Sequence, residues 1–294
     1  MELFSLAKPE DCSELINVTM EAFDEPFSTV KFVFENRIDF NCCYVCKVCG
    51  KIVSAVHMFP MDLKLSGKIF KSFYVYGACT LPKYQGKGYM TRLLNFVEED
   101  LKGKNRDFVF LVPETESLIK FYEKLGFKNF FKTKTAEFSN DEFKNLCKEK
   151  TEKEINFSYF SLEKLRKKLY NNINNVMYSV RDIKFAVDLY GFFGGKTITI
   201  ESGYGICTRN RESLIIRDFA CKEQDTGCLF EKIYKSFPNA KRYVLRTSPT
   251  NEFFKNYGES NFYGMIKPLK KENVNVINSI LNSEKFPYLG ISYD

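Results

Sequence analysis

Several features are missing from this 294-residue sequence, and some of these absences exclude whole classes of protein. Tryptophan is absent, and histidine occurs once, at His57. No run of about eighteen apolar residues occurs, so the sequence predicts no membrane-spanning helix and no membrane partner. The N-terminal stretch MELFSLAKPEDCSEL carries acids where a secretory signal needs a basic region and an apolar block. We therefore expect a soluble, cytoplasmic protein.

Strong net charge is also missing, which bears on the partners of the chain. The formal net charge is +7 over 294 residues, and the lysines are scattered through both halves. The densest basic stretch, residues 164–168, fits a solvated helix face better than a nucleic-acid site. Binding to nucleic acid would require a clustered basic face and would weaken steeply with salt. We therefore expect no nucleic-acid partner.

The ten cysteines are expected to be reduced thiols in the cytoplasm. Cys43, Cys46 and Cys49 have the C-x-x-C-x-x-C spacing typical of a metal or iron–sulfur site. However, the segment is also predicted to be a strand that enters a hairpin. Cys46 would then face away from the other two, and no fourth ligand is adjacent. We interpret these cysteines as small buried side chains and predict no metal.

The length and the 44% apolar content suit two domains with sizeable cores. We predict a first domain over residues 1–140, a helical linker over residues 141–156 and a second domain over residues 157–294. Hydrophobic periodicity predicts a mixed α+β fold with a largely antiparallel sheet. In the first half it predicts helices from about residue 9 to 23 and over 29–38, 90–103 and 116–124, and strands over 3–6, 42–48, 52–59, 63–65, 69–80, 107–112, 127–131 and 135–138. In the second half it predicts helices over 162–169, 183–189 and 227–237, and strands over 197–201, 204–208, 214–221 and 243–247.

Residues 77–103 carry the strongest functional signal, a strand, a glycine-containing turn and an amphipathic helix. Pro82 ends the strand, and Gln85-Gly86-Lys87-Gly88 turns the chain. The start of a helix offers unpaired N–H groups, and glycines let a phosphate approach them. Lys87 and Arg92 add positive charge, and no acid occurs between residues 80 and 96. The pattern indicates an anion site; the alternative is a strand, turn and helix with glycines needed only for geometry.

This stretch resembles motif A of the GNAT (GCN5-related N-acetyltransferase) family, whose pattern is [QR]-x-x-G-x-[GA]. Gln85 and Gly88 match that pattern, whereas Met90 stands where a small residue is expected. Downstream, the segment from Phe121 to Phe127 (FYEKLGF) is similar to the family's F-Y-x-x-x-G-F segment. A bulky residue such as Met90 is typical of the tandem GNAT proteins of the enhanced intracellular survival type, whose third domain we do not expect in this chain. The resemblance implies the GNAT acyl-CoA N-acyltransferase fold, with a twisted sheet flanked by helices.

The resemblance also implies an acyltransferase that moves the acetyl group of acetyl-CoA to a primary amine of a small molecule or a protein, by direct attack in a ternary complex. Backbone amides near Cys79 are implied to hold the developing oxyanion, and those of residues 87–92 the pyrophosphate. The acetyl-CoA-binding residues implied are Cys79, Thr80, Leu81, Gln85, Gly86, Lys87, Gly88, Tyr89, Met90, Thr91, Arg92 and Ser117. Tyr122 matches the family's general acid; the alternative is a core aromatic.

The base is less clearly marked. Glu114 is the candidate base, and Asp24, Glu25 and Glu116 are candidate contacts to a cationic amine; the alternative is ordinary solvated acids. His57 is a further candidate base, although it fits a satisfied strand residue better. In the tandem branch the C-terminal carboxylate acts as base, which would here be that of Asp294.

The second half resembles a GNAT core in the order of its elements but lacks motif A. Glu223 and Asp225 stand where a phosphate would bind. We predict a degenerate GNAT-like domain that does not hold acetyl-CoA and that shapes the acceptor pocket or a homo-oligomer interface; the alternative is an unrelated α+β domain. The rival function is a non-catalytic module that senses or binds acetyl-CoA.

Overall fold

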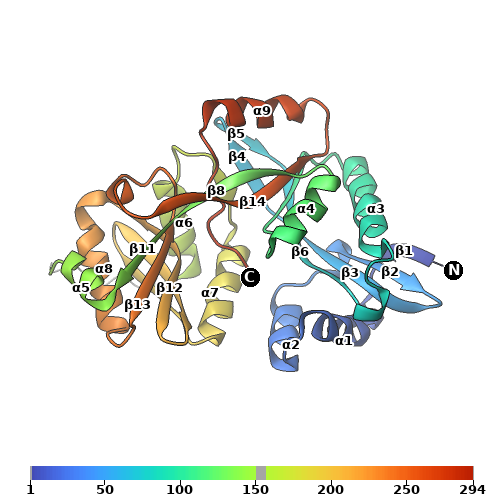
Figure 1. The fold of residues 1–294 in the computed structure, drawn as a ribbon, viewed down its shortest axis with the longest axis horizontal. Coiled ribbons are helices and arrows are strands. Elements are labelled where there is room, and N and C mark those ends of the chain that lie inside the picture. The colour runs from blue at the N-terminus through green and yellow to red at the C-terminus, as the bar shows by residue number, and fades with distance from the viewer. Residues whose placement is uncertain (1, 150–156, 294) are drawn as a thin grey trace. The chain divides into compact units, whose positions relative to one another are not determined.

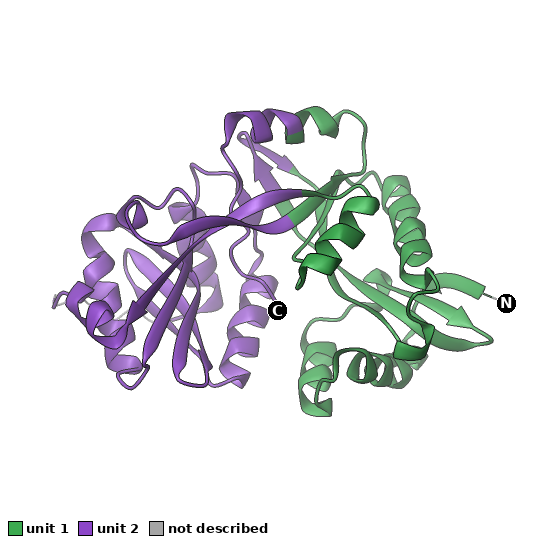
Figure 2. Cartoon of the chain, in the orientation of Figure 1, with its two compact units in different colours: residues 1–62, 70–128, 265–277 green, residues 63–69, 129–264, 278–294 purple. Residues whose placement is uncertain are grey.

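The computed structural model describes residues 2–149 and 157–293. The chain divides into two compact units, shown in Figure 2. Unit 1 comprises residues 1–62, 70–128 and 265–277, and unit 2 comprises residues 63–69, 129–264 and 278–294. These bounds differ from the predicted division at 140 and 157, because each unit contains chain from both halves of the sequence.

Unit 1 is a sheet with helices on both faces (Figure 1). Its strands are β1 (Glu2–Leu6), β2 (Cys43–Val48), β3 (Lys51–Pro60), β6 (Ser72–Thr80), β7 (Phe108–Leu111) and the end of β14 (Glu259–Pro268), in that spatial order. Its helices are α1 (Cys12–Phe23), α2 (Phe27–Asn36), α3 (Tyr89–Gly103) and α4 (Glu116–Lys124). One core cluster lies between the sheet and α3 and α4, and another lies under α1. Within this sheet β6 and β7 pair in parallel, and β1–β2, β2–β3, β3–β6 and β7–β14 pair antiparallel.

Unit 2 repeats this plan with its own strands. They are the start of β14, β8 (Lys128–Ser139), β13 (Arg242–Thr247), β12 (Ser213–Cys221), β11 (Gly203–Asn210) and β10 (Lys196–Ile200). A small second sheet contains β5 (Lys68–Phe70), β4 (Asp62–Leu65) and β9 (Asn175–Met177). The helices are α5 (Asn140–Leu146), α6 (Tyr159–Leu169), α7 (Val180–Phe192) and α8 (Thr226–Ser236), and α9 (Asn273–Ser283) has residues in both units.

Both units contain three antiparallel strands, a helix and a parallel strand, in that order along the chain. In unit 1 these are β2, β3, β6, α3 and β7, and in unit 2 they are β10, β11, β12, α8 and β13. The predicted fold class, a mixed α+β fold with a mostly antiparallel sheet, is confirmed. The order predicted for the second half is confirmed as well.

The last strand of each sheet comes from the other half of the sequence. Residues 134–139 of β8 pair with β13 of unit 2. In unit 1, β7 pairs instead with residues 265–268 of β14. Residues 127–131 and 135–138, predicted as two strands, therefore form one strand, because β8 runs through both segments to reach its partner.

The predicted helical linker begins with a helix that packs on unit 2. Residues 140–146 form α5, whose Phe143 is fully buried and stacks on Tyr243 with ring centroids 4.0 Å apart. Because a buried aromatic ring fixes the helix to the core, α5 belongs to unit 2. Residues 150–156 of the predicted linker lie outside the described residues.

Several smaller differences have local causes. The strand predicted over residues 69–80 breaks at Lys71, whose N–H donates to Asp107 Oδ2 at 2.8 Å. Phe23 of α1 and Leu118 of α4 lie on the apolar side of their helices in the sequence pattern, yet they are 43% and 36% exposed. The sequence did not predict β14 or α9. None of the helices in the described ranges is long and apolar enough to cross a membrane.

Candidate functional site

The site begins where β6 and β7 separate. Their parallel register pairs Ser72 with Phe108, Phe73 with Val109 and Tyr74 with Phe110, and it stops there. β6 continues to Thr80, and among the described residues this last part of the strand pairs with β3 on its other side alone. The last residues of β6 therefore present one backbone edge that β7 does not cover, and such an edge can bind an extended ligand.

A β-bulge lies on this uncovered stretch. The register between β3 and β6 passes from Ala55–Cys79 to His57–Tyr76, so Gly77 and Ala78 together oppose one residue of β3. Gly77 has φ +57°, which glycine adopts without strain. The bulge turns backbone groups of β6 out of the regular ladder. The sequence analysis missed it, although a glycine inside a strand is a typical signal for a bulge.

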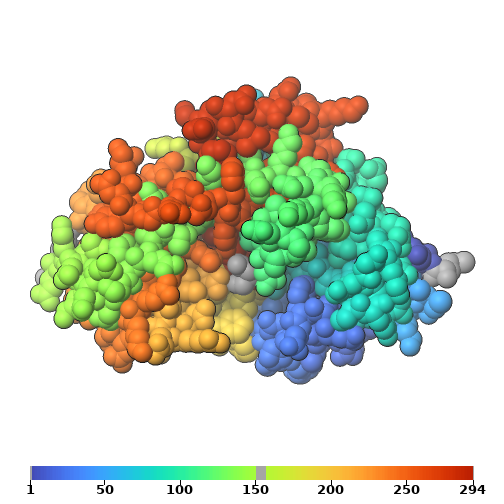
Figure 3. All heavy atoms as spheres, in the orientation of Figure 1, coloured from blue at the N-terminus to red at the C-terminus, as the bar shows by residue number. Residues whose placement is uncertain are grey.

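The loop after β6 leads to an open helix terminus. Gln85 Nε2 donates to the carbonyl oxygen of Thr80 at 3.1 Å, which ties the loop to the strand. Gly86 and Gly88 have φ values of +73° and +77°. Gly88 is the N-cap of α3, no side chain caps it, and the first turn of α3 carries no acid. Residues 85–88 are exposed, and Figure 3 shows this blue-green segment at the surface of unit 1. The first N–H groups of α3 can therefore receive an anion.

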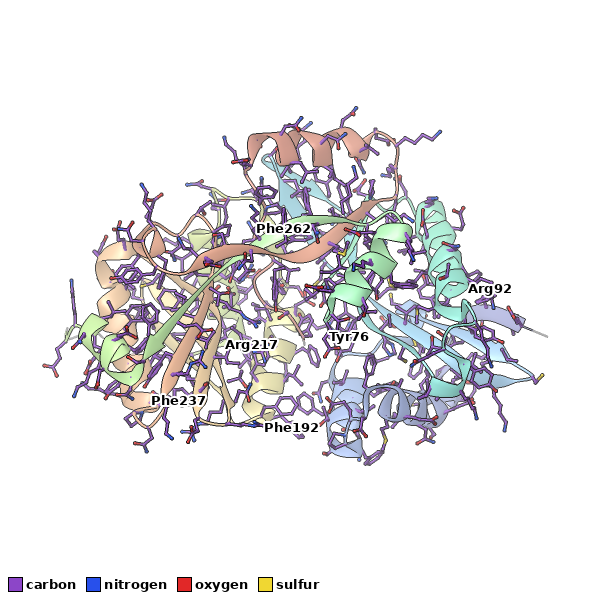
Figure 4. All side chains as sticks on the ribbon, viewed as in Figure 1. Tyr76, Arg92, Phe192, Arg217, Phe237 and Phe262 are labelled. Atoms are coloured by element: carbon purple, nitrogen blue, oxygen red, sulfur yellow. The ribbon has the colours of Figure 1, made fainter. Side chains whose placement is uncertain are left out.

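The positive charge at this terminus is partly compensated. Arg92 donates to both carboxylate oxygens of Glu2 at 3.1 Å and, through Nη1, to the carbonyl oxygen of Lys87. Figure 4 shows Arg92 on α3, beside β1. Residues 80–96 contain no acid, but β1 brings Glu2 to this terminus from the start of the chain. Lys87 Nζ lies 5.2 Å from the centroid of the Tyr84 ring and donates to the carbonyl oxygen of Lys83 at 3.0 Å.

The remaining residues predicted around motif A fall into two groups. Cys79 and Leu81 are buried, and burial raises the pKa of the Cys79 thiol to about 12, so it stays protonated. Thr80 is half-buried, and its hydroxyl lies 2.9 Å from Ser54 Oγ. Tyr89, Met90 and Thr91 form the half-buried first turn of α3. Met90 packs against the core between α3 and the sheet, so its bulk turns away from the loop.

Helix α4 places Tyr122 in the same core. The side chain is 7% exposed and lies between the rings of Phe121 and Phe127, at centroid distances of 5.1 and 5.5 Å. Burial raises the pKa of Tyr122 to about 12 because it disfavours the phenolate. The phenol is therefore protonated at neutral pH and can donate a proton. Ser117 is exposed in the first turn of α4, with its Oγ 2.9 Å from Oγ1 of Thr115.

The predicted acids lie on exposed loops and helix ends of unit 1. Glu114 and Glu116 follow β7, and Asp24 and Glu25 form the turn between α1 and α2. All four side chains are exposed, so packing against the core does not fix their positions. Their roles as base or as substrate contacts stay predictions. Asp294 lies outside the described residues.

His57 and one of the three clustered cysteines differ from the predictions made for them. His57 was expected to be a satisfied strand residue, but both ring nitrogens are buried without a hydrogen-bond partner in the described structure. Cys43 and Cys46 are buried, as predicted, whereas Cys49 is exposed in the turn after β2. Within residues 2–149 and 157–293 no three His, Cys, Asp or Glu side chains could together hold a metal ion.

Comparison with known proteins agrees with this geometry. Residues 4–130 match a family model described as an acetyltransferase (GNAT) domain. The S-alkylcysteine N-acetyltransferase of Bacillus subtilis is 31% identical over 109 residues, which are 33% of this chain and 60% of that protein. The chain thus covers 60% of the length of this curated relative.

Two solved structures resemble most of the chain. A conserved protein of Enterococcus faecalis, described as a probable N-acyltransferase, aligns with a TM-score of 0.72 at 12% identity, covering 92% of this chain and 73% of that one. Eis1 of Mycobacterium abscessus aligns with a TM-score of 0.66 at 10% identity, covering 94% and 76%. At these identities the likeness shows the fold alone. The family match therefore identifies residues 4–130 as a GNAT acetyltransferase domain, and these solved structures share the fold of most of the chain.

Proposed function

We propose that unit 1 binds acetyl-CoA and transfers its acetyl group to a primary amine of a small molecule or a protein. One observation carries this proposal. The uncapped start of α3, with Gly86 and Gly88 at positive φ, follows directly on the stretch of β6 that β7 leaves uncovered. An anion-binding helix terminus beside a free strand edge suits a ligand with a pyrophosphate at one end and an amide-containing arm at the other.

The residues of the loop fit such a ligand. No atom lies within 4 Å of a Cβ placed on Gly86, so the backbone there is open to a phosphate. The amides of residues 87–92 would hold the pyrophosphate, with Lys87 and Arg92 as nearby cations. Gln85 keeps the loop against Thr80, and the uncovered edge around residues 79–81 would hold the arm. Ser117 is a further expected contact.

The chemistry then divides between ligand and protein. Acetyl-CoA supplies an acyl thioester, which an uncharged amine attacks. Backbone N–H groups of β6 near Cys79 would polarise the carbonyl group. Tyr122, protonated at neutral pH, would give its proton to the leaving thiolate. Glu114 stays a candidate base, and Asp24, Glu25 and Glu116 stay candidate contacts for a cationic acceptor.

We propose a different role for unit 2. Its corresponding strands stay paired, and the start of its corresponding helix is buried. β12 stays paired with β13 up to Phe219 and Thr247, and Thr247 Oγ1 donates to the carbonyl oxygen of Phe219 at 2.7 Å. The first residues of α8, from Thr226 to Phe230, are buried, and Asp225 precedes them. We therefore propose that unit 2 is a degenerate GNAT-like unit that does not bind acetyl-CoA. Homo-oligomer formation and cytoplasmic location stay predictions.

The acceptor can be approached through the curated relative. That protein is named for N-acetylation of S-alkylcysteine. S-Methylcysteine is therefore the first acceptor to test here, followed by a polyamine, an aminoglycoside and a lysine peptide. Acetylation of any of these would support the proposal and would select the acceptor class.

The first experiment is calorimetric titration of the protein with acetyl-CoA, beside the Gly88→Glu variant. We expect micromolar binding to the wild type and its loss in the variant, because a carboxylate at the N-cap occupies and repels the anion site. Gly88 has φ +77°, so thermal unfolding must show that the variant is folded. Gly103→Glu is the matched control, since Gly103 lies at the other end of α3 with open space around its Cα.

The outcomes separate the readings. Binding that Gly88→Glu abolishes and Gly103→Glu retains would support a site at motif A. No binding to the folded wild type would overturn the proposal. Binding without acetylation of any tested amine would favour an acetyl-CoA-sensing module instead.

A further inference from the structure

His57 is the only histidine of the chain, and its position needs an explanation. Its side chain on β3 is 3% exposed. Neither Nδ1 nor Nε2 makes a hydrogen bond to any residue that the structure describes. Burying polar atoms without partners destabilises a fold, whereas an apolar side chain at this position would avoid the cost. Both ring nitrogens are therefore free of protein partners in the described structure and can form a hydrogen bond with a ligand.

Aromatic side chains lie against the ring. Phe34 of α2 meets it edge-on with centroids 5.5 Å apart, and Tyr76 of β6 lies at 6.4 Å. Tyr76 also stacks on Phe59 at 4.8 Å. Burial alone lowers the pKa of His57 to about 4, so the imidazole is neutral at physiological pH. A neutral imidazole carries one N–H donor and one acceptor nitrogen.

The ring lies directly against the β6 bulge. A Cβ placed on Gly77 would lie 3.2 Å from His57 Cδ2, so the glycine permits the close approach. The bulge belongs to the stretch of β6 that β7 does not cover, where the acyl group is proposed to bind. His57 also contacts α2, whereas its neighbours Val56 and Met58 pack in the core on the α3 side. His57 therefore lies on the α2 side of the sheet, opposite α3.

We propose that His57 contacts the acceptor amine as the proton-accepting group of the reaction. Its unprotonated nitrogen accepts a hydrogen bond from the amine N–H and takes that proton as the new N–C bond forms. The thioester C–S bond breaks, the thiolate takes the proton of Tyr122, and solvent returns both protein groups to their starting protonation states. The proposal rests on the proposed function of unit 1.

The same geometry indicates the kind of acceptor. Phe34 and Tyr76 lie against the imidazole, and Phe59, which stacks on Tyr76, has the guanidinium of Arg37 4.0 Å from its centroid. Such surroundings disfavour a polycation and favour an amine with a single apolar substituent. Small amines with an alkyl or thioether group are therefore expected to be better substrates than polyamines.

The kinetic test compares His57→Phe and His57→Gln with Met58→Leu as the control. Met58 is the next residue of β3 but lies in the core on the α3 side. We expect His57→Phe to lower kcat by about 100-fold or more, because loss of a general base typically has that effect. Its affinity for acetyl-CoA should change by less than about twofold, since the anion site is untouched. His57→Gln keeps a hydrogen-bond acceptor, so its KM for the amine should lie closer to the wild-type value than that of His57→Phe. Its kcat should recover little.

A second measurement uses the wild type and needs no variant to fold. Because the chain has one histidine, selective ¹⁵N labelling gives an unambiguous imidazole spectrum. We expect methylamine, added to the protein with coenzyme A, to shift one imidazole nitrogen toward the hydrogen-bonded value. The same addition to the Tyr122→Phe protein should give the same shift.

The two proposals fail in different ways. If acetyl-CoA does not bind, the proposed function fails and this inference fails with it. If acetyl-CoA binds and an amine is acetylated, a His57→Phe variant with wild-type kcat overturns the inference alone. If no tested amine is acetylated, the imidazole spectrum decides. The inference about His57 is then overturned if neither methylamine nor S-methylcysteine shifts the imidazole signals.

Discussion

The guanidinium group of Arg166 donates from Nε to Oδ2 of Asp218 at 3.0 Å, with side chains only 4% and 0% exposed. Three tyrosine hydroxyls complete the shell of the carboxylate: Tyr204 at 2.7 Å, Tyr288 at 2.8 Å and Tyr170 at 3.3 Å. Tyr288 belongs to the C-terminal segment, so this network fixes the end of the chain to the core of unit 2.

We predict that Asp218→Ala destabilises the protein by about 3–5 kcal/mol, because it leaves a buried guanidinium without its counter-charge. Urea unfolding measures the change. The double variant Arg166→Met with Asp218→Leu should recover part of that loss, because no buried charge is left although Tyr204 and Tyr288 lose their acceptor. Glu137→Gln is the control: it breaks the exposed pair with Arg242 and should cost less than about 1 kcal/mol. Equal costs for Asp218→Ala and Glu137→Gln would contradict this account.

Tyr122→Phe is predicted to lower kcat by about 10²–10⁴-fold while acetyl-CoA affinity stays within about twofold. The phenyl ring preserves the packing against Phe121 and Phe127 and removes only the proton donor. Because the pKa of Tyr122 is raised to about 12, its ionisation should produce no alkaline loss of activity below about pH 11. Steady-state kinetics across pH checks both statements. Unchanged kcat would assign Tyr122 to the core alone.

The stability of the protein is predicted to depend on pH through His57. Its pKa is about 4 when folded and near 6.5 in the unfolded chain, so the unfolded state binds more protons between these values. Stability is therefore lost as the pH falls from about 6.5 to 4, by up to about 3 kcal/mol.

Urea midpoints of the wild type and His57→Phe at several pH values test this. The wild-type curve should fall more steeply than that of the variant within this window, and the two should run parallel above pH 7. Parallel curves throughout would show that His57 is accessible to solvent or finds a partner.

Glu2→Gln is predicted to raise the affinity for acetyl-CoA about two- to fivefold at low salt. Glu2 pairs with Arg92 beside the start of α3, and both side chains are about two-fifths exposed. Removing the carboxylate frees the cation for a phosphate, and salt should screen the gain. Calorimetry at low and high ionic strength measures it. Glu10→Gln is the control, because Glu10 pairs with Lys8 instead; an equal gain there would indicate a general charge effect.

Much of the candidate site could be predicted from residues 77–103. The strand ending at Pro82, the turn with Gly86 and Gly88 and the apolar face of α3 depend on neighbours in the sequence. Local periodicity and glycine conformations fix them before any distant contact forms. The structure confirms these elements, along with α4 around Tyr122 and the β-β-β-α-β order of the second half.

The tertiary structure alone decided which distant segments meet. The residues of β8 were predicted as two strands, and β14 was missed. The partners of both strands are chosen by pairing across more than a hundred residues, which the local sequence does not show. In the same way β1 brings Glu2 to Arg92, and β3 buries His57 against the bulge at Gly77. The sequence by itself determined the local conformation of the loop over residues 85–88. Packing between segments far apart in the chain decided the charge beside that loop and the polarity of its surroundings, because burial and pairing are properties of the whole fold.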